Sequence, residues 1–207
     1  MRVTNPLSNI LNSKVKIDCL RHMCLYPTEL NGRELSRYVK VTHRSIYKAM
    51  RSLVDEGVVN FTPRGNSIGY ILNKEKWISK NILIPLFRSE REFLETIVEK
   101  LKKEFEGSQF KNNILSVVLF GSVYRKEDNS SSDFDIFVLI DQEENVIPVE
   151  EEIAKISSKI SKLYGVTLGP YWKSLSSFKK DKSLGVIKSI KAANRLIYGK
   201  ELVKYDP

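Results

Sequence analysis

Residues 121–137, "GSVYRKEDNSSSDFDIF", decide the interpretation of the C-terminal part of this 207-residue chain. Asp133 and Asp135 are two residues apart, and they lead an apolar run that ends at Ile140. Because side chains alternate along a strand, both carboxylates are expected on the same face. Like charges this close repel each other, so the pair predicts a binding site for a cation.

The residues before the acid pair predict a binding site for an anion. The apolar stretch 114–120, "ILSVVLF", predicts a buried strand that runs directly into Gly121 and Ser122. Glycine lets a backbone pass close to a phosphate, and the amides and hydroxyl that follow can donate to it. An anion site at the end of one strand and an acid pair at the start of the next favour a divalent cation, because Mg²⁺ prefers carboxylates together with substrate phosphates.

Strand, Gly-Ser, a gap of ten residues, Asp-x-Asp and strand together resemble the polymerase-β-type nucleotidyltransferase superfamily, and most closely its minimal nucleotidyltransferases. The resemblance spans about residues 88–200, and "IKAANRLIYGKEL" (190–202) looks like the C-terminal helix of that branch and its exit. It implies a mixed sheet flanked by helices that binds a nucleoside triphosphate with Mg²⁺ or Mn²⁺. The implied nucleotide-binding residues are Gly121, Ser122, Arg125 and Ser132, and the implied catalytic and metal-binding residues are Asp133 and Asp135. The structural alternative is that both aspartates are solvated turn residues after "NSSS".

One feature departs from the superfamily. Its active members usually carry a third carboxylate on a later strand, where it completes the metal site and helps to deprotonate the attacking hydroxyl. The corresponding stretch 166–174, "VTLGPYWKS", has no Asp or Glu, and Thr167 and Gly169 stand where the acid is expected. Activation by a general base contributes about 10²–10⁴-fold to a rate. The sequence therefore supports nucleotide binding better than turnover.

Positive charge is concentrated in the first part of the chain. Residues 1–80 contain 14 Lys and Arg against 6 Asp and Glu, whereas residues 81–207 contain 20 against 19, within a net charge of +9. This asymmetry predicts two domains, 1–80 and 81–207, of which the first binds a polyanion. Beyond residue 80, Ser89 and Glu92 predict a capping box at the start of a helix that runs to about Glu106.

The elements expected in residues 13–74 are three helices and a hairpin. Residues 13–26, 32–39 and 44–56 have helical spacing of apolar residues, with Thr42 as an N-cap, and two short strands follow at 58–63 and 68–73. This order resembles the winged helix-turn-helix family of DNA-binding modules. The two resemblances together imply an α+β fold, in which a winged helix-turn-helix precedes a mixed-sheet nucleotidyltransferase-like domain.

The winged-helix resemblance implies binding to double-stranded DNA, with the third helix in the major groove and the hairpin on the backbone or minor groove. The implied DNA-binding residues are His43, Arg44, Ser45, Tyr47, Lys48 and Arg51 on that helix, and Arg64 and Asn66 at the tip of the hairpin. The alternative is a winged helix that makes protein contacts only. Because winged-helix regulators often form dimers, we expect a homodimer.

Two functional classes therefore remain open. The first is a nucleotidyltransferase that modifies an unidentified acceptor, which includes a protein such as the toxin of a toxin–antitoxin pair. The second is a transcriptional regulator whose transferase-like domain senses a nucleotide or mediates assembly. No run approaches the roughly 20 apolar residues that span a bilayer, so we expect no membrane association. Cys19 and Cys24 are expected to be core cysteines of a reduced, cytoplasmic protein.

Overall fold

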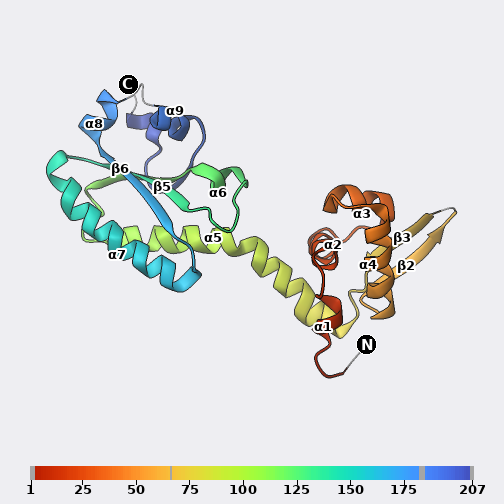
Figure 1. Ribbon diagram of the computed structural model, residues 1–207. Coiled ribbons are helices and arrows are strands. Elements are labelled where there is room, and N and C mark those ends of the chain that lie inside the picture. The colour runs from red at the N-terminus through yellow and green to blue at the C-terminus, as the bar shows by residue number, and fades with distance from the viewer. Residues whose placement is uncertain (1–2, 66, 182–184, 206–207) are drawn as a thin grey trace. The chain divides into compact units, whose positions relative to one another are not determined.

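The computed structural model describes residues 3–65, 67–181 and 185–205, and the chain divides into two compact units, Met1–Phe93 and Leu94–Pro207. The division lies within helix α5 (Ile84–Gly107), later than the boundary expected at residue 80. Each unit combines helices with one sheet (Figure 1), and the sheet of the C-terminal unit is mixed, which confirms the expected α+β fold with a mixed sheet in the C-terminal part. No helix among the described residues is long and apolar enough to cross a membrane.

The N-terminal unit is a group of helices followed by a hairpin (Figure 1). Its elements are α1 (Leu7–Ile10), α2 (Lys14–Leu25), β1 (Leu30–Asn31), α3 (Gly32–Val39), α4 (His43–Asp55), β2 (Val59–Arg64), β3 (Ser67–Leu72) and the π-helical turn η1 (Ser79–Leu83). The strands form an antiparallel sheet in the order β1-β3-β2. The hairpin register pairs Val59 with Leu72 at its base and Arg64 with Ser67 at its tip.

Helices α2, α3 and α4 of this unit each begin where a side chain caps them. The Ser13 side chain accepts from the Lys16 amide, and the Thr42 side chain accepts from the Ser45 amide, which confirms Thr42 as an N-cap. Asn31 forms a capping box with Glu34. Each helix then turns an apolar stripe inward, and the stripe of α4 buries Ile46, Ala49, Met50 and Leu53 completely or nearly so. Burial of such side chains contributes about 1.5–3 kcal/mol each, so this stripe fixes the outward face of α4.

The helix predicted to start at Ser89 begins earlier. Helix α5 starts at Ile84, directly after η1, and passes through Ser89 without interruption. The reason is that Leu83 and Phe87 continue the buried stripe toward the N-terminus. Pro85, which has no N–H to donate, comes directly after the π-helical turn η1, where the helical hydrogen-bond pattern is already irregular.

The C-terminal unit is a four-stranded sheet with helices on both faces (Figure 1). Its elements are α5, β4 (Ile114–Leu119), α6 (Gly121–Arg125), β5 (Phe134–Ile140), η2 (Glu143–Asn145), α7 (Val146–Tyr164), β6 (Leu168–Ser174), α8 (Leu175–Lys180), α9 (Gly185–Ala192), β7 (Arg195–Gly199) and η3 (Leu202–Tyr205). The strand order is β6-β5-β4-β7, in which β5 and β6 are parallel and the other pairs antiparallel.

The alternation of side chains along β5 separates two cores. Phe134, Ile136 and Val138 are buried with helices α5 and α7 on one face. Phe137 and Leu139 are buried with α8, α9 and η3 on the other face. Asp135 has the same parity as Phe137, so its side chain lies on the face of α8 and α9. This assignment determines which residues of β6 can approach it.

The stretch 190–202, expected as a helix and its exit, is only partly helical. Helix α9 ends at Ala192, and residues 195–199 form the edge strand β7, which pairs antiparallel with β4. The chain leaves the helix here because Leu196 and Ile197 fill the cores on opposite faces of the sheet, which a strand allows and a helix does not.

Candidate functional site

The two aspartates lie at the start of β5. Asp135 is the second residue of the strand and is half-buried, whereas Asp133 precedes the strand and is exposed. The strand thus begins one residue later than expected. The two carboxylates interact, because the charge of Asp133 raises the pKa of Asp135.

Gly121 lies against one side of the Asp135 carboxylate. Its φ of 76° is in the left-handed region, and a Cβ at this position would lie 2.0 Å from Oδ2 of Asp135. The Phe120 amide donates to the Asp135 carbonyl at 3.0 Å, which ties the end of β4 to the start of β5. Position 121 therefore requires glycine for both its backbone conformation and its contact with the acid.

Gly169 lies against the other side of the same carboxylate. The parallel register pairs Asp135 with Gly169 of β6. A Cβ on Gly169 would lie 2.9 Å from Oδ1 of Asp135 and 3.4 Å from Cβ of Asp133. The Asp135 carboxylate is therefore held between two glycine backbones, one from the end of β4 and one from β6.

The electrostatics of the site leave Asp135 short of positive charge. Burial raises the pKa of Asp135 most, the negative charge of Asp133 raises it further, and the guanidinium of Arg125 opposes both. Arg125 is exposed, and its Nε donates to Oε2 of Glu127 at 2.8 Å. Arg125 thus acts on Asp135 through its field while its hydrogen bond goes to Glu127.

The loop between Ser122 and Asp133 is shaped by its own hydrogen bonds. The Ser122 carbonyl accepts from the Glu127 amide at 2.9 Å. The Ser132 hydroxyl accepts from the Asn129 amide at 2.9 Å, and the Ser132 amide donates to the Asn129 carbonyl at 3.0 Å. Ser132, expected at the nucleotide, therefore fixes the turn that leads into Asp133.

These residues fit one divalent cation. Mg²⁺ is held in proteins by one or two carboxylates, with phosphates and water completing its octahedron. Asp133 and Asp135 supply the carboxylates, and the pKa of Asp135 is raised first by burial and then by the charge of Asp133, both of which a bound cation would offset. In the described parts of the chain, no three or more His, Cys, Asp or Glu side chains gather in a group that could hold a metal.

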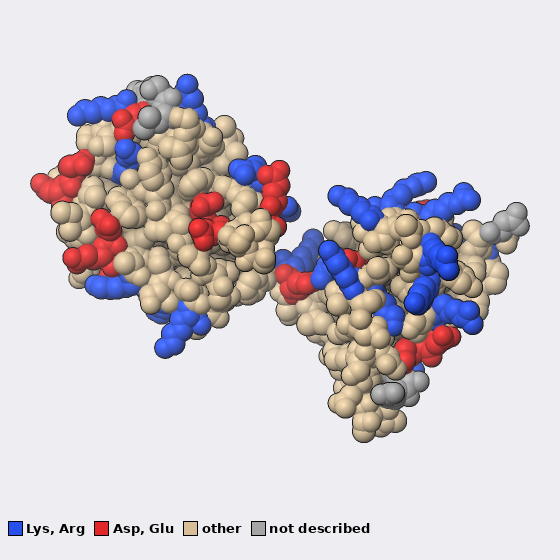
Figure 2. Space-filling view, in the orientation of Figure 1, with Lys and Arg blue, Asp and Glu red and all other residues tan. Residues whose placement is uncertain are grey.

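The N-terminal unit carries a second charged surface. Arg44, Lys48 and Arg51 are exposed on the outward face of α4, and Tyr47 between them is 49% exposed. Figure 2 shows Lys and Arg side chains gathered on the visible face of this unit. The sequence analysis missed Arg33, Arg37 and Lys40, which are exposed on and directly after α3. Their helical spacing away from the buried Leu35 was the signal that could have identified them.

The other residues implied in DNA binding have different surroundings. Ser45 lies within hydrogen-bond distance of the Thr42 hydroxyl, at 2.9 Å, so it belongs partly to the helix cap. Arg64 forms an ion pair with Glu29, with Nε 2.7 Å from Oε1. His43 is exposed and packs over Gly32, where a Cβ would lie 2.7 Å from its Nε2. Asn66 lies outside the described residues.

A groove of about 510 Å³ runs beside these residues. It is bounded by the start of α3, the first turns of α4 and strand β3. Its lining residues are Asn31, Gly32, Arg33, His43, Tyr47, Ser67, Ile68 and Tyr70. His43 and Tyr47 thus border a depression rather than a flat helix surface.

The sequence analysis identified Gly169 only as a place where an acid was expected. Its contact with Asp135 follows from the pairing of β5 with β6, which needs the register of two parallel strands. A glycine inside a strand often marks a close approach by another group, and this was the available signal.

No curated protein matches the sequence. The solved structure described as "Crystal structure of the toxin-antitoxin with AMP-PNP" is similar at 16% identity and a TM-score of 0.35, over 52% of this chain and 82% of that chain. The archaeal chromatin protein TrmBL2, described with a novel mode of DNA binding, is similar at 16% identity and a TM-score of 0.29, over 90% of this chain and 72% of that chain.

The family model described as "Polymerase beta, Nucleotidyltransferase" matches residues 99–202. This match spans just over half of the chain and includes β4, the Gly121–Ser122 turn and the acid pair. The chain therefore belongs to the polymerase beta nucleotidyltransferase family.

Proposed function

We propose that this protein binds duplex DNA through its N-terminal unit and a nucleoside triphosphate with Mg²⁺ or Mn²⁺ through its C-terminal unit. The nucleotide part rests above all on the Asp135 carboxylate, which lies between Gly121 and Gly169 with the like charge of Asp133 beside it. Two carboxylates beside a glycine turn are suited to a cation that is bound together with phosphates. Family membership supports the same proposal.

Each residue of the site has a distinct part in this proposal. Asp133 and Asp135 hold the cation, and the Gly121–Ser122 turn donates its amides and the Ser122 hydroxyl to the triphosphate. When bound, the cation neutralises phosphate charge and polarises the phosphoryl group. Arg125 adds positive charge near the same phosphates, and Ser132 positions Asp133 through the turn at Asn129.

Calorimetric titration of the full-length chain with ATP tests this proposal. Mg²⁺ is expected to increase ATP affinity, because the ion links the carboxylates to the phosphates. Changing both aspartates, Asp133→Asn with Asp135→Asn, is expected to remove that increase. Equal affinity for ATP with and without Mg²⁺ in the unchanged protein would contradict the proposal.

DNA binding is proposed for the exposed face of α4, with the hairpin β2–β3 as a second contact. The observation that favours it is the set of three exposed cations, Arg44, Lys48 and Arg51, on the side of α4 opposite its buried stripe. Side chains so placed on a helix reach phosphates and base edges in a major groove. A homodimer would place two such helices on half-sites about 10 bp apart.

A mobility-shift assay at several salt concentrations tests the DNA proposal. Arg44→Ala with Lys48→Ala is expected to weaken binding and, if both side chains contact phosphates, to reduce the salt slope by about 2. The matched control is Lys102→Ala with Lys103→Ala, which removes the same charge from exposed positions of the C-terminal unit. If the control pair weakens binding as much as the α4 pair, the net charge and not α4 is responsible.

Two functions can follow from these two activities. One is transfer of a nucleotidyl group to an acceptor, which family membership supports. The acceptor in this case could be a protein such as a partner toxin. The other is transcriptional regulation in which the C-terminal unit senses the nucleotide or mediates assembly, for which the lack of an acid in β6 speaks. Transfer of a labelled nucleotide to a co-purified protein or RNA separates the two.

A further inference from the structure

The β6 residues nearest the acid pair determine how many cations the site can hold. On the face of Asp135, β6 presents Gly169, Tyr171 and Lys173, because parallel pairing brings residues of like parity to the same face. Gly169 is the one in contact, with a would-be Cβ 2.9 Å from Oδ1 of Asp135. Gly169 thus occupies the place from which this strand would supply a further ligand, and it has no side chain to supply.

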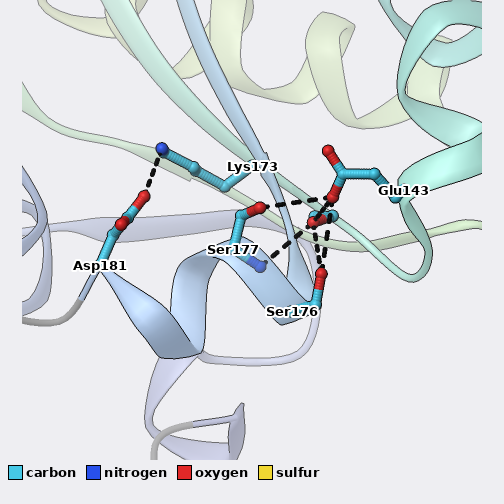
Figure 3. A network of polar contacts seen from close by, with 6 residues as sticks. Glu143, Lys173, Ser176, Ser177 and Asp181 are labelled. Atoms are coloured by element: carbon cyan, nitrogen blue, oxygen red, sulfur yellow. Dashed lines mark hydrogen bonds and ion pairs between the residues drawn. The ribbon is translucent and has the colours of Figure 1, made fainter.

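The next two residues along this face of β6 are engaged elsewhere. The Tyr171 ring lies 5.8 Å from the Phe137 ring, within the core under α8. Lys173 carries a positive charge, and its Nζ is 2.5 Å from Oδ2 of Asp181 (Figure 3). Asp181, the acid nearest after β6 in the sequence, is therefore bound to a lysine on this strand.

Two acids that follow β5 are also engaged elsewhere. The carboxylate of Asp141, directly after the strand, accepts from the side-chain amides of Asn113 and Asn145. Glu143 lies three residues beyond the end of β5, whereas Asp135 lies at its start. Its Oε2 accepts from the hydroxyls of Ser174, Ser176 and Ser177 (Figure 3). None of Asp181, Asp141 and Glu143 thus serves as a third acid for the pair at the start of β5.

The number of protein carboxylates at the acid pair limits the site further. Two-metal sites hold their ions about 3.5–4 Å apart, and the two dications repel each other unless ligands shared between them offset the repulsion. Asp133 and Asp135 supply two carboxylates, which suffice for one divalent cation that also binds the triphosphate. The bound triphosphate can complete the shell of that ion with its own oxygens.

We propose that this site binds one divalent cation per nucleotide rather than the pair used in two-metal phosphoryl transfer, and that Gly169 sets this limit. The inference rests on the proposed nucleotide binding and specifies its form. The ion that joins the carboxylates to the triphosphate is retained, and a second ion that would activate an attacking hydroxyl has no ligand from β6. The nucleotide is then a bound ligand that the domain senses, and transfer is slow.

Counting manganese tests the inference without measuring activity. The full-length protein is equilibrated with MnCl₂ and an ATP analogue whose bridge between the α and β phosphates resists cleavage, and the retained metal and nucleotide are measured after ultrafiltration. We expect one manganese per retained nucleotide. Two per nucleotide would overturn the inference and leave nucleotide binding standing. Failure to retain any nucleotide would overturn the proposed function itself, and the inference with it.

A glycine substitution tests the assignment to Gly169. Gly169→Ala would push a Cβ against Asp135, whose carboxylate has no room to retreat because Gly121 lies on its other side. We expect manganese–nucleotide affinity to fall about tenfold, the lower range for residues that position a metal ligand. Gly107→Ala is the matched control, because a Cβ there meets nothing within 4 Å. Unchanged affinity of Gly169→Ala, at an unchanged melting temperature, would overturn the close contact assigned to Gly169 and the Asp135 carboxylate, on which the proposed place of Gly169 in the site depends.

Discussion

The two ends of the β5–β6 strand pair treat their acids in opposite ways. At the start, Asp135 lies between two glycines beside Asp133, and burial and that neighbour raise its pKa. Beyond the other end, Glu143 accepts from three serine hydroxyls, which lower its pKa. At one end of this strand pair, hydrogen bonds of the protein stabilise the charge of Glu143. At the other end, the charges of Asp133 and Asp135 are left without such stabilisation by the described residues.

This difference separates an acid that the hydrogen bonds of the protein stabilise, Glu143, from an acid for which we propose a bound cation, Asp135. The Glu143 cluster joins the end of β5 to the start of α8, because Ser174 is both the last residue of β6 and the N-cap of that helix. At the Asp135 end, the proximity of the Asp133 and Asp135 carboxylates costs stability through repulsion of like charges. Uncompensated charge that persists in a fold is a reason to assign a ligand to it.

The largest expected effect is that substitutions at the two ends of the strand pair change the melting temperature in opposite directions, and that only one of them changes nucleotide binding. In EDTA, Asp133→Asn with Asp135→Asn is expected to raise the melting temperature of the C-terminal unit, because the repulsion between the carboxylates is removed. Glu143→Gln is expected to lower it and to leave the Mg²⁺-dependent increase in ATP affinity intact. The comparison fails if Glu143→Gln also removes that increase, or if the double variant melts lower.

The melting of one unit must be followed separately in these experiments. The chain has two tryptophans, Trp77 and Trp172, and Trp172 lies in β6. In a Trp77→Phe background, the fluorescence of Trp172 therefore reports unfolding of the C-terminal unit alone.

A smaller effect is expected from the serine that caps α8. Ser174 is 1% exposed, and its hydroxyl accepts from the Ser177 amide at 3.2 Å while donating to Glu143. Ser174→Ala is expected to lower the free energy of unfolding by about 1 kcal/mol, the usual cost of losing an N-cap. Ser176→Ala is the control, because Ser176 is exposed and its hydroxyl contacts the Ser174 hydroxyl at 3.0 Å and Glu143 at 3.5 Å but caps no backbone amide of α8. Equal losses in both variants, measured by urea denaturation, would mean that the cap contributes nothing.

The sequence predicts most of the fold because its signals are local. Thr42 caps α4 by accepting a hydrogen bond from the Ser45 amide, three residues away. The apolar run after Asp133 forms β5 because its alternate residues enter the cores on opposite faces of the sheet. The start of α5 and the strand β7 were not predicted, because both depend on distant partners. Helix α5 begins before Ser89 because Phe87 packs into the core of the N-terminal unit. Residues 195–199 form a strand because they pair with the edge of β4.

The acids of the candidate site could be predicted from the sequence, but the residues that surround them could not. Gly121 and the aspartate pair stand close in sequence, and their spacing marks them. Gly169 and the serines around Glu143 reach their places only through the register of β5 and β6. The involvement of Ser132 in the turn at Asn129 likewise follows from backbone geometry, which the sequence does not reveal.

The smallest expected effect is the pH dependence of the Glu143 end. The hydrogen bond from Ser174 lowers the pKa of Glu143 most, and burial opposes it. The hydrogen bonds from Ser177 and Ser176 and the charge of Lys180 lower the pKa further, so it lies below its ordinary value of 4.5. A carboxyl with a lowered pKa in the folded state contributes stability above its unfolded pKa, and that contribution is lost as pH falls through the folded pKa. Glu143→Gln should therefore destabilise the C-terminal unit at neutral pH and progressively less below pH 4.5. Urea denaturation at several pH values, followed through Trp172, measures the difference, with Glu144→Gln as the neighbouring control. A difference that stays constant down to the lowest pH at which the protein folds would show that the Glu143 charge is not what the serines stabilise.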